Sequence, residues 1–468
     1  MSNEKIYINF QRLSAYHLIT LMKKELHKNR TSPSTGFKNI FRSLHYQNYR
    51  LFFYGQSISL IGTWIQRIAV PWMVYDITGS VFYLGLVGFA GQIPTFLLAP
   101  FAGVLIDRWN RYTILVITQV LAMLQAFVLV FLVYNKSIEI WEIVALSIFL
   151  GCINAFDMPA RQSFVVDMIE KKEDLGNAIA LNSSMVNSAR LIGPSIAGIL
   201  ISLTGEGICF LVNALSYLVV IYFLLKMKIP ARKVMAKATQ GLKGFKEGFS
   251  YTFGFAPIRA IILLLAMVSL MGMPYTVLMP VYAKTILHGG SHTFGFLIGA
   301  SGVGALAGAF YMASRKSVLG LEKIIPLMAV VFGSGLILIS FSHSFLISMI
   351  LMVIIGLGMI MQMTTSNTIL QTLVDDDKRG RVMSFYTMAF MGTAPFGSLL
   401  AGSLASRIGV PNTLIIGGVS CILGATVFAR KLPGLKKMMH PIYKRMGILP
   451  EVPLEIETYA TTNINIEP

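Results

Sequence analysis

Twelve apolar runs decide what this chain can fold into. A helix needs about 20 apolar residues to cross the roughly 30 Å of hydrocarbon in a bilayer, and it satisfies its own backbone hydrogen bonds there. The composition agrees, because 55% of the 468 residues are hydrophobic, 13% are charged, and the mean hydropathy is +0.67. We therefore predict an all-α membrane protein with twelve transmembrane helices. The runs fall near residues 51–75, 81–106, 112–134, 141–163, 177–203, 206–226, 258–283, 293–314, 322–342, 344–367, 382–406 and 411–430.

The distribution of basic residues predicts the orientation of the chain. The formal net charge is +18, which in a soluble protein would favour nucleic-acid binding. With a cytoplasmic N-terminus, however, 34 of the 39 Lys and Arg residues fall in cytoplasmic segments, and only Lys136, Lys284 and Arg407 fall in outer loops. This positive-inside bias predicts that both termini are cytoplasmic, and we expect no nucleic-acid partner.

Internal similarity divides the spans into two sets of six. The segment from Leu175 aligns without a gap with the segment from Arg379, and four of the matched pairs are Gly or Ala. Small residues at such positions allow helices to cross closely in lipid. Two related bundles of six helices form the architecture of the major facilitator transporters, with the substrate site between the halves. The matched pairs, each 204 residues apart, are Gly176 with Gly380, Gly193 with Gly397, Ala197 with Ala401, and Gly198 with Gly402.

The same division gives the expected domains. We predict a cytoplasmic N-terminal lead (1–49), an N-terminal six-helix bundle (50–226), a basic cytoplasmic central loop (227–257), a C-terminal six-helix bundle (258–430) and a cytoplasmic C-terminal tail (431–468).

Several motifs resemble one transporter family. "GVLIDRWNRY", from Gly103 to Tyr112, resembles the signature loop of the major facilitator superfamily, with Asn110 in place of the usual Gly. "SLHYQNYRLFFYGQSISLIGTWIQ" from Ser43, "NAFDMPARQSFVVDMI" from Asn154 and "NAIALNSSMVNSARLIGPSIAGIL" from Asn177 resemble its transmembrane secretion effector, or enterobactin-exporter-like, subgroup. The resemblance implies an exporter of small molecules such as siderophores or drugs in a bacterial inner membrane.

The resemblance also implies a latch that ties the cytoplasmic ends of the two halves together in the outward-open state. In proteins with this loop, the loop Asp caps the start of span eleven and a loop Arg pairs with an acid on span four. Here Asp107 would face residues 382–385, and Arg108 or Arg111 would pair with Asp157. The alternative is a static pair between Asp157 and Arg161 at the end of span four. The predicted latch residues are Gly103, Asp107, Arg108, Arg111, Asp157 and Arg161.

Two arginines lie deep within predicted spans. A guanidinium at that depth costs several kcal/mol unless it faces a wet cavity or a partner. We therefore hypothesise that Arg67 and Arg190 line the central cavity with Gln66 and Asn187, and that they favour an anionic or catechol-like cargo. The alternative is that both arginines bond to backbone carbonyls and to Gln66 or Asn187.

"GPSIAGIL" resembles the Gly-Pro motif that antiporters carry on span five. Pro194 removes a helical hydrogen bond, and Gly193 and Gly198 permit close packing. We predict a bend or a seal at this motif; a packing kink alone is the alternative.

The sequence therefore predicts a secondary active exporter of a small amphipathic or anionic molecule that works by alternating access. The resemblance implies proton coupling, for which Asp157 is the nearest candidate carboxylate. The alternatives are an importer of an anionic nutrient and a non-transporting sensor or assembly factor. We expect no enzymatic activity, cofactor or metal site, because nucleotide-binding loops and metal-ligand clusters are absent from the sequence. The default oligomeric state is a monomer.

Overall fold

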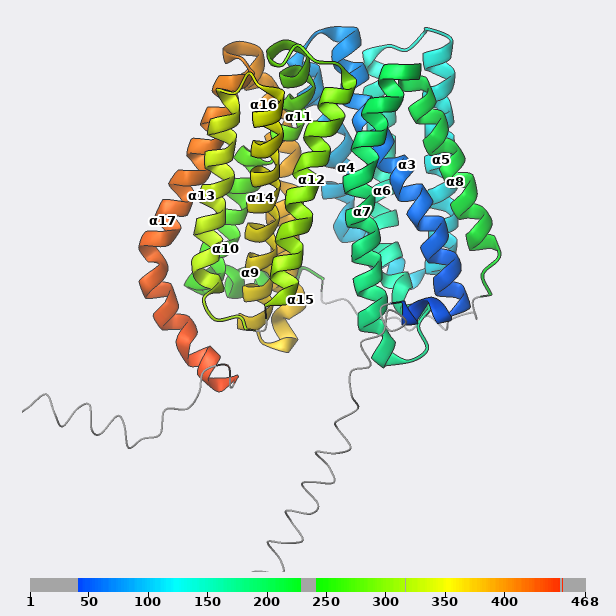
Figure 1. Ribbon diagram of the computed structural model, residues 1–468. Coiled ribbons are helices and arrows are strands. Elements are labelled where there is room, and N and C mark those ends of the chain that lie inside the picture. Colours follow the sequence, from blue (N-terminus) through cyan, green and yellow to red (C-terminus); the bar gives the residue numbers. More distant parts are fainter. Residues whose placement is uncertain (1–40, 229–240, 316, 447, 449–468) are drawn as a thin grey trace, which may run out of the picture.

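The described elements of the computed structural model are all helices, in residues 41–228, 241–315, 317–446 and 448. Figure 1 shows two bundles side by side, and both ends of the described chain lie at the same end of the molecule. We call this end the terminal face and the opposite end the distal face. The first bundle consists of η1 (Arg42–His45), α3 (Gln47–Thr78), α4 (Val81–Arg108), α5 (Arg111–Tyr134), α6 (Ile140–Asp167), α7 (Lys172–Thr204) and α8 (Glu206–Leu225).

The second bundle also has six spans, two of which are interrupted by π-helical turns. Its helices are α10 (Ala256–Met267), η2 (Val268–Gly272), α11 (Tyr275–Val281) and η3 (Tyr282–Ile286), then α12 (Ser291–Ser314), α13 (Leu321–Ser340), α14 (Phe345–Leu373), α15 (Asp376–Thr387), η4 (Met388–Gly392), α16 (Ala394–Ile408) and α17 (Val410–Arg445).

The twelve predicted spans are all present. Among the described residues, eleven helical stretches are long and apolar enough to cross a membrane. The twelfth is α3, which is 32 residues long and packs against α7 and α8. Its low mean hydropathy has a simple cause, because it carries Arg67 and Asp76 as well as several glutamines and serines.

Two helical segments lie where the sequence suggested a loop and a tail. Within the central segment, α9 spans Gly241–Gly254. At the C-terminal end, α17 continues to Arg445 because Leu435, Met439 and Tyr443 follow a spacing of four residues and are buried. The N-terminal lead up to residue 40 and the end of the tail lie outside the described residues.

The two bundles approach most closely at two glycine crossings. A Cβ atom on Gly198 of α7 would lie 2.8 Å from the carbonyl oxygen of Ser291 and 3.1 Å from the Cα of Gly295, both in α12. A Cβ atom on Gly402 of α16 would lie 2.7 Å from the Cα of Gly85 in α4. Gly198 and Gly402 are an aligned pair of the internal repeat, so the two crossings are pseudo-symmetric equivalents.

We predict that Gly198→Val prevents the bundles from closing at the distal face, because the added side chain meets backbone atoms of α12. A cysteine introduced at the buried Ser291 should then react several-fold faster with a thiol reagent that reaches only the distal face, and transport should be lost.

The matched control lies on the same helix. A Cβ atom on Gly176 would meet nothing within 4 Å, so Gly176→Val should leave the labelling rate at Ser291 unchanged. Equal labelling in the Gly198 and Gly176 variants would show that the crossing does not hold the distal face closed.

Candidate transport pathway

The distal face is closed by polar and aromatic contacts between the bundles. Lys284 Nζ of the second bundle lies 2.6 Å from Asp76 Oδ1 of the first. The same ammonium lies 5.8 Å from the ring centroid of Trp72 and 5.7 Å from that of Tyr75. Trp72 in turn stacks on Phe294 of α12, with 6.2 Å between ring centroids and 18° between the ring planes. We call these five residues the distal gate.

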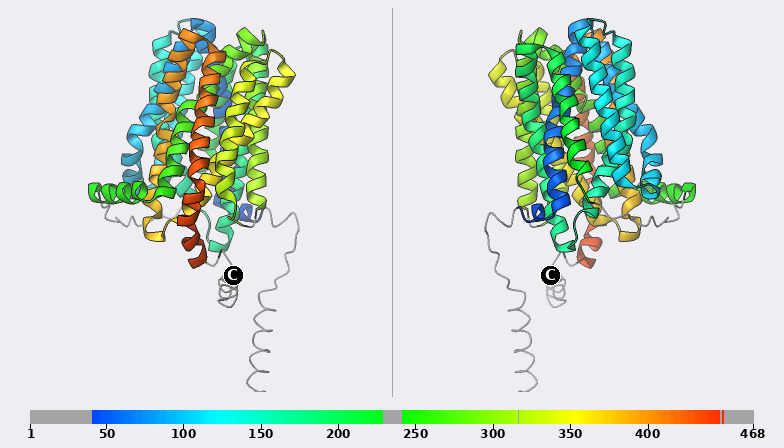
Figure 2. Two further views of the ribbon diagram at one scale, coloured as in Figure 1. Left: turned by 90° about the vertical axis from the view of Figure 1, so that its left-hand side faces the viewer. Right: turned by 90° about the vertical axis from the view of Figure 1, so that its right-hand side faces the viewer.

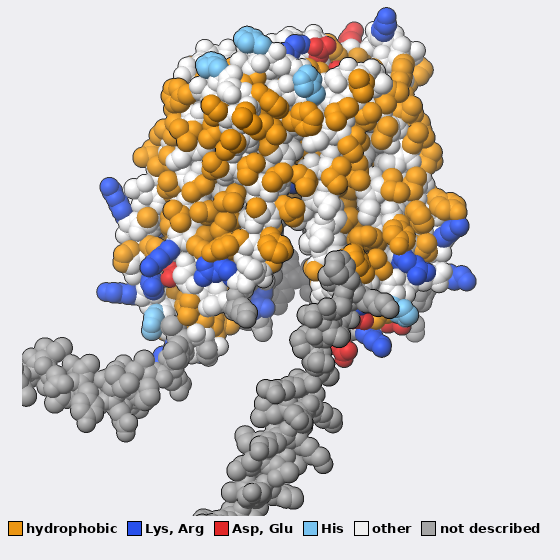
Figure 3. Space-filling model, viewed as in Figure 1, with side chains coloured by type: hydrophobic (Ala, Val, Ile, Leu, Met, Phe, Trp, Pro, Cys, Tyr) orange, Lys and Arg blue, Asp and Glu red, His pale blue; other side chains and the backbone are white. Residues whose placement is uncertain are grey.

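The terminal face is open between the bundles. Figure 3 shows the molecule hollowed there, between its two halves. Among the described side chains, every ion pair near this face joins residues of one bundle. Arg111 with Asp167 and Arg42 with Asp174 belong to the first, whereas Arg381 with Glu247, Lys436 with Glu322 and Arg445 with Asp375 belong to the second. The structure is therefore closed at the distal face and open at the terminal face.

Arg67 and Arg190 meet at one tryptophan. The Cζ atom of Arg67 lies 5.0 Å from the ring centroid of Trp64, and that of Arg190 lies 6.0 Å from it. Gly193 of α7 permits this arrangement, since a Cβ atom there would collide with the Cβ atom of Trp64. Cation–π contact is favourable but leaves the N–H donors of a guanidinium unbonded. We call Trp64, Arg67 and Arg190 the arginine–tryptophan cluster.

The cluster lies in the interior of the first bundle and reaches the second. The charged or polar groups that interact with Arg67 are Tyr217 of α8, Arg161 of α6 and Arg190 of α7. Arg190 also interacts electrostatically with Tyr275 of α11, in the other bundle. Arg67 is nevertheless solvent-exposed, although it lies near the middle of a 32-residue helix. These neighbours place the guanidinium groups at the boundary between the two bundles.

The predicted alternative, in which polar neighbours satisfy both arginines, is not what the structure contains. Among the described residues, neither guanidinium has a hydrogen bond or an ion pair. Gln66 is buried and bonds at both ends of its amide, to Gln125 Oε1 at 3.0 Å and from Asn213 Nδ2 at 2.7 Å. The amide of Asn187 donates to the Ser183 carbonyl at 2.9 Å, within its own helix.

Sequence reasoning missed Trp64 and the amide chain around Gln66. Trp64 precedes Arg67 by three residues, a spacing that puts both on one face of a helix, and this signal was available. Gln125 and Asn213 lie in other spans, so only the fold brings their amides to Gln66.

Asp157 has three partners inside the first bundle. Its Oδ2 atom lies 2.6 Å from Arg161 NH2, and its Oδ1 atom accepts hydrogen bonds from Gln119 Nε2 at 2.7 Å and Thr118 Oγ1 at 3.0 Å. Arg161 also donates from NH1 to Gln56 Oε1 at 3.2 Å, which links α6 to α3. Asp157 is only 4% exposed, so these bonds stabilise a buried carboxylate.

The expected pair between Arg111 and Asp157 is not formed. Arg111 NH1 lies 3.0 Å from Asp167 Oδ2 and also donates to the Ser163 carbonyl at 3.2 Å. Asp157 and Asp167 are ten residues apart on α6, a separation of about 15 Å along the helix axis. Arg111, as the first residue of α5, is level with Asp167 at the end of α6.

The other predicted latch contacts fall partly outside the described side chains. Those of Asp107 and Arg108 are outside them, and Gly103 lies within α4. The predicted partner region of Asp107, residues 382–385, lies in α15. There the ring of Phe385 packs against Phe249 and Phe253 of α9, with centroids 6.0 Å apart in both pairs.

The Gly-Pro motif of span five lies at the seam between the bundles. Pro194 is inside α7, and its carbonyl group would be struck by a Cβ atom on Gly295 of α12. Gly193 faces Trp64 and Gly198 faces α12. The motif therefore joins the arginine–tryptophan cluster to the glycine crossing along one helix.

Two bundles of six helices with a passage between them define a transporter of the major facilitator fold. Solved structures agree: a bacterial homologue of the lysosomal transporter Spinster matches with a TM-score of 0.65 at 15% identity, covering 83% of this chain and 98% of that chain. A bacterial homologue of the iron transporter ferroportin matches with a TM-score of 0.63 at 18% identity, covering 82% of this chain and 98% of that chain.

The sequence identifies the family more closely. The family described as transmembrane secretion effector matches residues 39–458, and the chain belongs to this family of major facilitator transporters. The staphyloferrin A transporter of Staphylococcus aureus is 28% identical over 380 residues, which cover 81% of this chain and 95% of the relative. Macrolide efflux protein A of Streptococcus pyogenes is 23% identical, over 82% of this chain and 96% of the relative. The resemblance seen in the sequence is confirmed, and the protein is a multi-span membrane transporter rather than an enzyme.

We predict that Asp157→Asn destabilises the protein, because Arg161 loses its charged partner within the first bundle. The free energy of unfolding should fall by about 2 to 3 kcal/mol. The measurement is the thermal unfolding midpoint in detergent, which should be lower than that of the wild type.

Asp167→Asn is the matched control, since Asp167 is on the same helix and its pair with Arg111 lies near the end of α6. This substitution should lower the free energy of unfolding by less than about 1 kcal/mol. An equal fall in both variants would contradict a special structural role for the Asp157 network.

Proposed function

We propose that this protein exports a small anionic or amphipathic molecule from the bacterial cytoplasm by alternating access. The observation that carries the proposal is the arginine–tryptophan cluster, whose two guanidinium groups have no hydrogen-bond acceptor among the described residues and lie between bundles that are open on one face. A carboxylate or another oxygen-rich group of the cargo would accept hydrogen bonds from the guanidinium N–H donors. Trp64 would offer its ring to an apolar part of the same molecule.

The proposed direction of transport is inferred from the distribution of basic residues along the chain. The basic loops gather at the terminal face, so the positive-inside rule makes that face cytoplasmic in the bacterial inner membrane. The described conformation would then accept cargo from the cytoplasm. Opening of the distal gate and separation of the glycine crossings would release it on the other side.

The relatives support cargo of this kind. The similar proteins include a staphyloferrin A transporter and a macrolide efflux protein, so siderophores and drugs are the first compounds to test. The chemistry of the cluster favours the anionic compounds among them.

Proton coupling is the proposed source of energy, with Asp157 as its carrier. The carboxylate is buried, yet its partner Arg161 can keep the second hydrogen bond to Gln56 when Asp157 takes up a proton. Protonation would therefore release one contact between residues of α6 without leaving Arg161 entirely unbonded.

We predict that Arg67→Gln and Arg190→Gln each weaken transport of an anionic cargo. The loss of one charge-assisted contact is worth about 1.5 to 3 kcal/mol, so KM for transport should rise about 10- to 100-fold. The measurement is accumulation of candidate siderophores and drugs in cells with and without the transporter, normalised to the amount of protein in the membrane.

Arg407→Gln is the control, because Arg407 is exposed near the distal end of α16, away from the cluster. If both cluster variants transported every anionic cargo like the wild type, the proposed cargo-binding site would be wrong. Lower accumulation in cells that lack the transporter would instead identify an importer, and no dependence of any cargo on the transporter would favour a sensor or assembly factor.

We predict that a proton uncoupler abolishes export by the wild-type protein. Asp157→Asn should then retain exchange of cargo down its own gradient but lose accumulation against that gradient. Active export by Asp157→Asn at the wild-type rate would remove Asp157 as the proton carrier and leave the cargo site untouched.

A further inference from the structure

The helix within the central segment, α9, packs against α15 and also contacts α10. Figure 2 shows α9 lying across the axes of the bundle helices and projecting at the terminal face. Its Phe249 and Phe253 rings are 4.5 Å apart, and each is 6.0 Å from the Phe385 ring of α15. Glu247 also pairs with Arg381 of α15 at 2.7 Å. A short helix in this position and orientation suits the interface between lipid headgroups and water.

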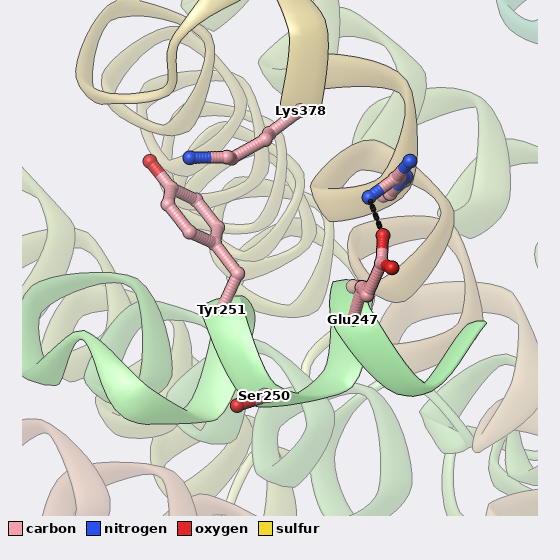
Figure 4. A pocket seen from close by; sticks show the side chains of 6 residues that line it. Glu247, Ser250, Tyr251 and Lys378 are labelled. Atoms are coloured by element: carbon pink, nitrogen blue, oxygen red, sulfur yellow. Dashed lines mark hydrogen bonds and ion pairs between the residues drawn. The ribbon is translucent and has the colours of Figure 1, made fainter. Parts of the chain in front are cut away.

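A pocket of about 420 Å³ lies between α9 and α15. Figure 4 shows Lys378 and Tyr251 converging from the two helices, with Glu247 on the same side of α9 as Tyr251 and Ser250 pointing away from Lys378. The Lys378 ammonium lies 4.7 Å from the Tyr251 ring centroid. The residues that line the pocket are Glu247, Gly248, Ser250, Tyr251, Lys378 and Arg381.

The charge of Lys378 is not neutralised by any described side chain. No described carboxylate lies within ion-pair distance of its ammonium group, whereas Arg381 beside it is paired with Glu247. Lys378 is half-buried, so an anion that reached it would be only partly screened by water.

The surroundings favour an anion that belongs to the membrane. The Phe249 side chain of α9 is 50% exposed, which gives an apolar surface next to the charged pocket. A basic residue beside a bilayer is attracted to anionic lipids by about 1 kcal/mol.

We propose that the pocket between α9 and α15 binds the phosphate of an anionic phospholipid headgroup, with Lys378 as its main ligand. The bound lipid would hold α9 against α15 at the terminal end of span eleven. This site is independent of the cargo site and of the direction of transport.

The test uses the full-length protein, purified in a non-ionic detergent, and follows the thermal unfolding midpoint while lipid is added. Short-chain phosphatidylglycerol should raise the midpoint saturably, since a ligand that binds only the folded state stabilises it. Lys378→Gln should weaken the apparent Kd about tenfold, in line with the loss of one charge-assisted contact. Lys378→Arg should restore most of the affinity.

Lys437→Gln is the matched control, because Lys437 is exposed on the terminal part of α17 and away from the pocket. It should bind phosphatidylglycerol like the wild type. An equal response to phosphatidylcholine, or an unchanged Kd in Lys378→Gln, would overturn the proposal. Equally tight binding of glycerol phosphate or inorganic phosphate would overturn the lipid assignment and identify a site for soluble phosphate.

Discussion

Close backbone contact at two glycine crossings is the constraint on which the rest of the structure depends. Lipid supplies no hydrophobic force between helices, so their association relies on close packing. Gly198 against α12 and Gly402 against Gly85 bring the bundles together at the distal face. Once they meet there, Lys284 can reach Asp76 and Trp72 can stack on Phe294. Because these contacts gather at one end, the passage is left open at the other.

The charged side chains within the spans of the first bundle are of two kinds. Asp157 and Arg161 satisfy one another and are supported by amide and hydroxyl groups from α3 and α5. Arg67 and Arg190 contact the face of Trp64 and have no hydrogen bond or ion pair among the described residues. An unbonded guanidinium within a span is costly unless water or a ligand reaches it. This contrast separates a network that holds the bundle together from a cluster suited to binding, and it is why the proposed cargo site is centred on Trp64.

One helix connects these features. Along α7, the Arg190 guanidinium lies 6.0 Å from the centroid of the Trp64 ring, Gly193 makes room for the Trp64 side chain, and Gly198 forms the distal crossing. Eight residues therefore separate the proposed cargo contact from the seam, a distance of about 12 Å along the helix. If the proposed cargo moves α7 at Arg190, that movement would act on the crossing, which is how the proposed bend or seal at the Gly-Pro motif would operate.

The sequence by itself determined the twelve spans, the two halves and the repeated glycines, because lipid forces a long apolar run to become a helix and a repeat is visible without coordinates. It also indicated that Arg67 and Arg190 lie deep in the membrane, where a guanidinium group is costly unless it contacts water or a partner. Only the tertiary structure decided that Trp64 joins them, that Gln66 is occupied by Gln125 and Asn213, and that Arg111 meets Asp167 instead of Asp157. It likewise decided that the tail continues as helix and that α9 packs on α15. These outcomes depend on how each helix is rotated and which neighbour it faces, and hydropathy along one chain carries no information about either.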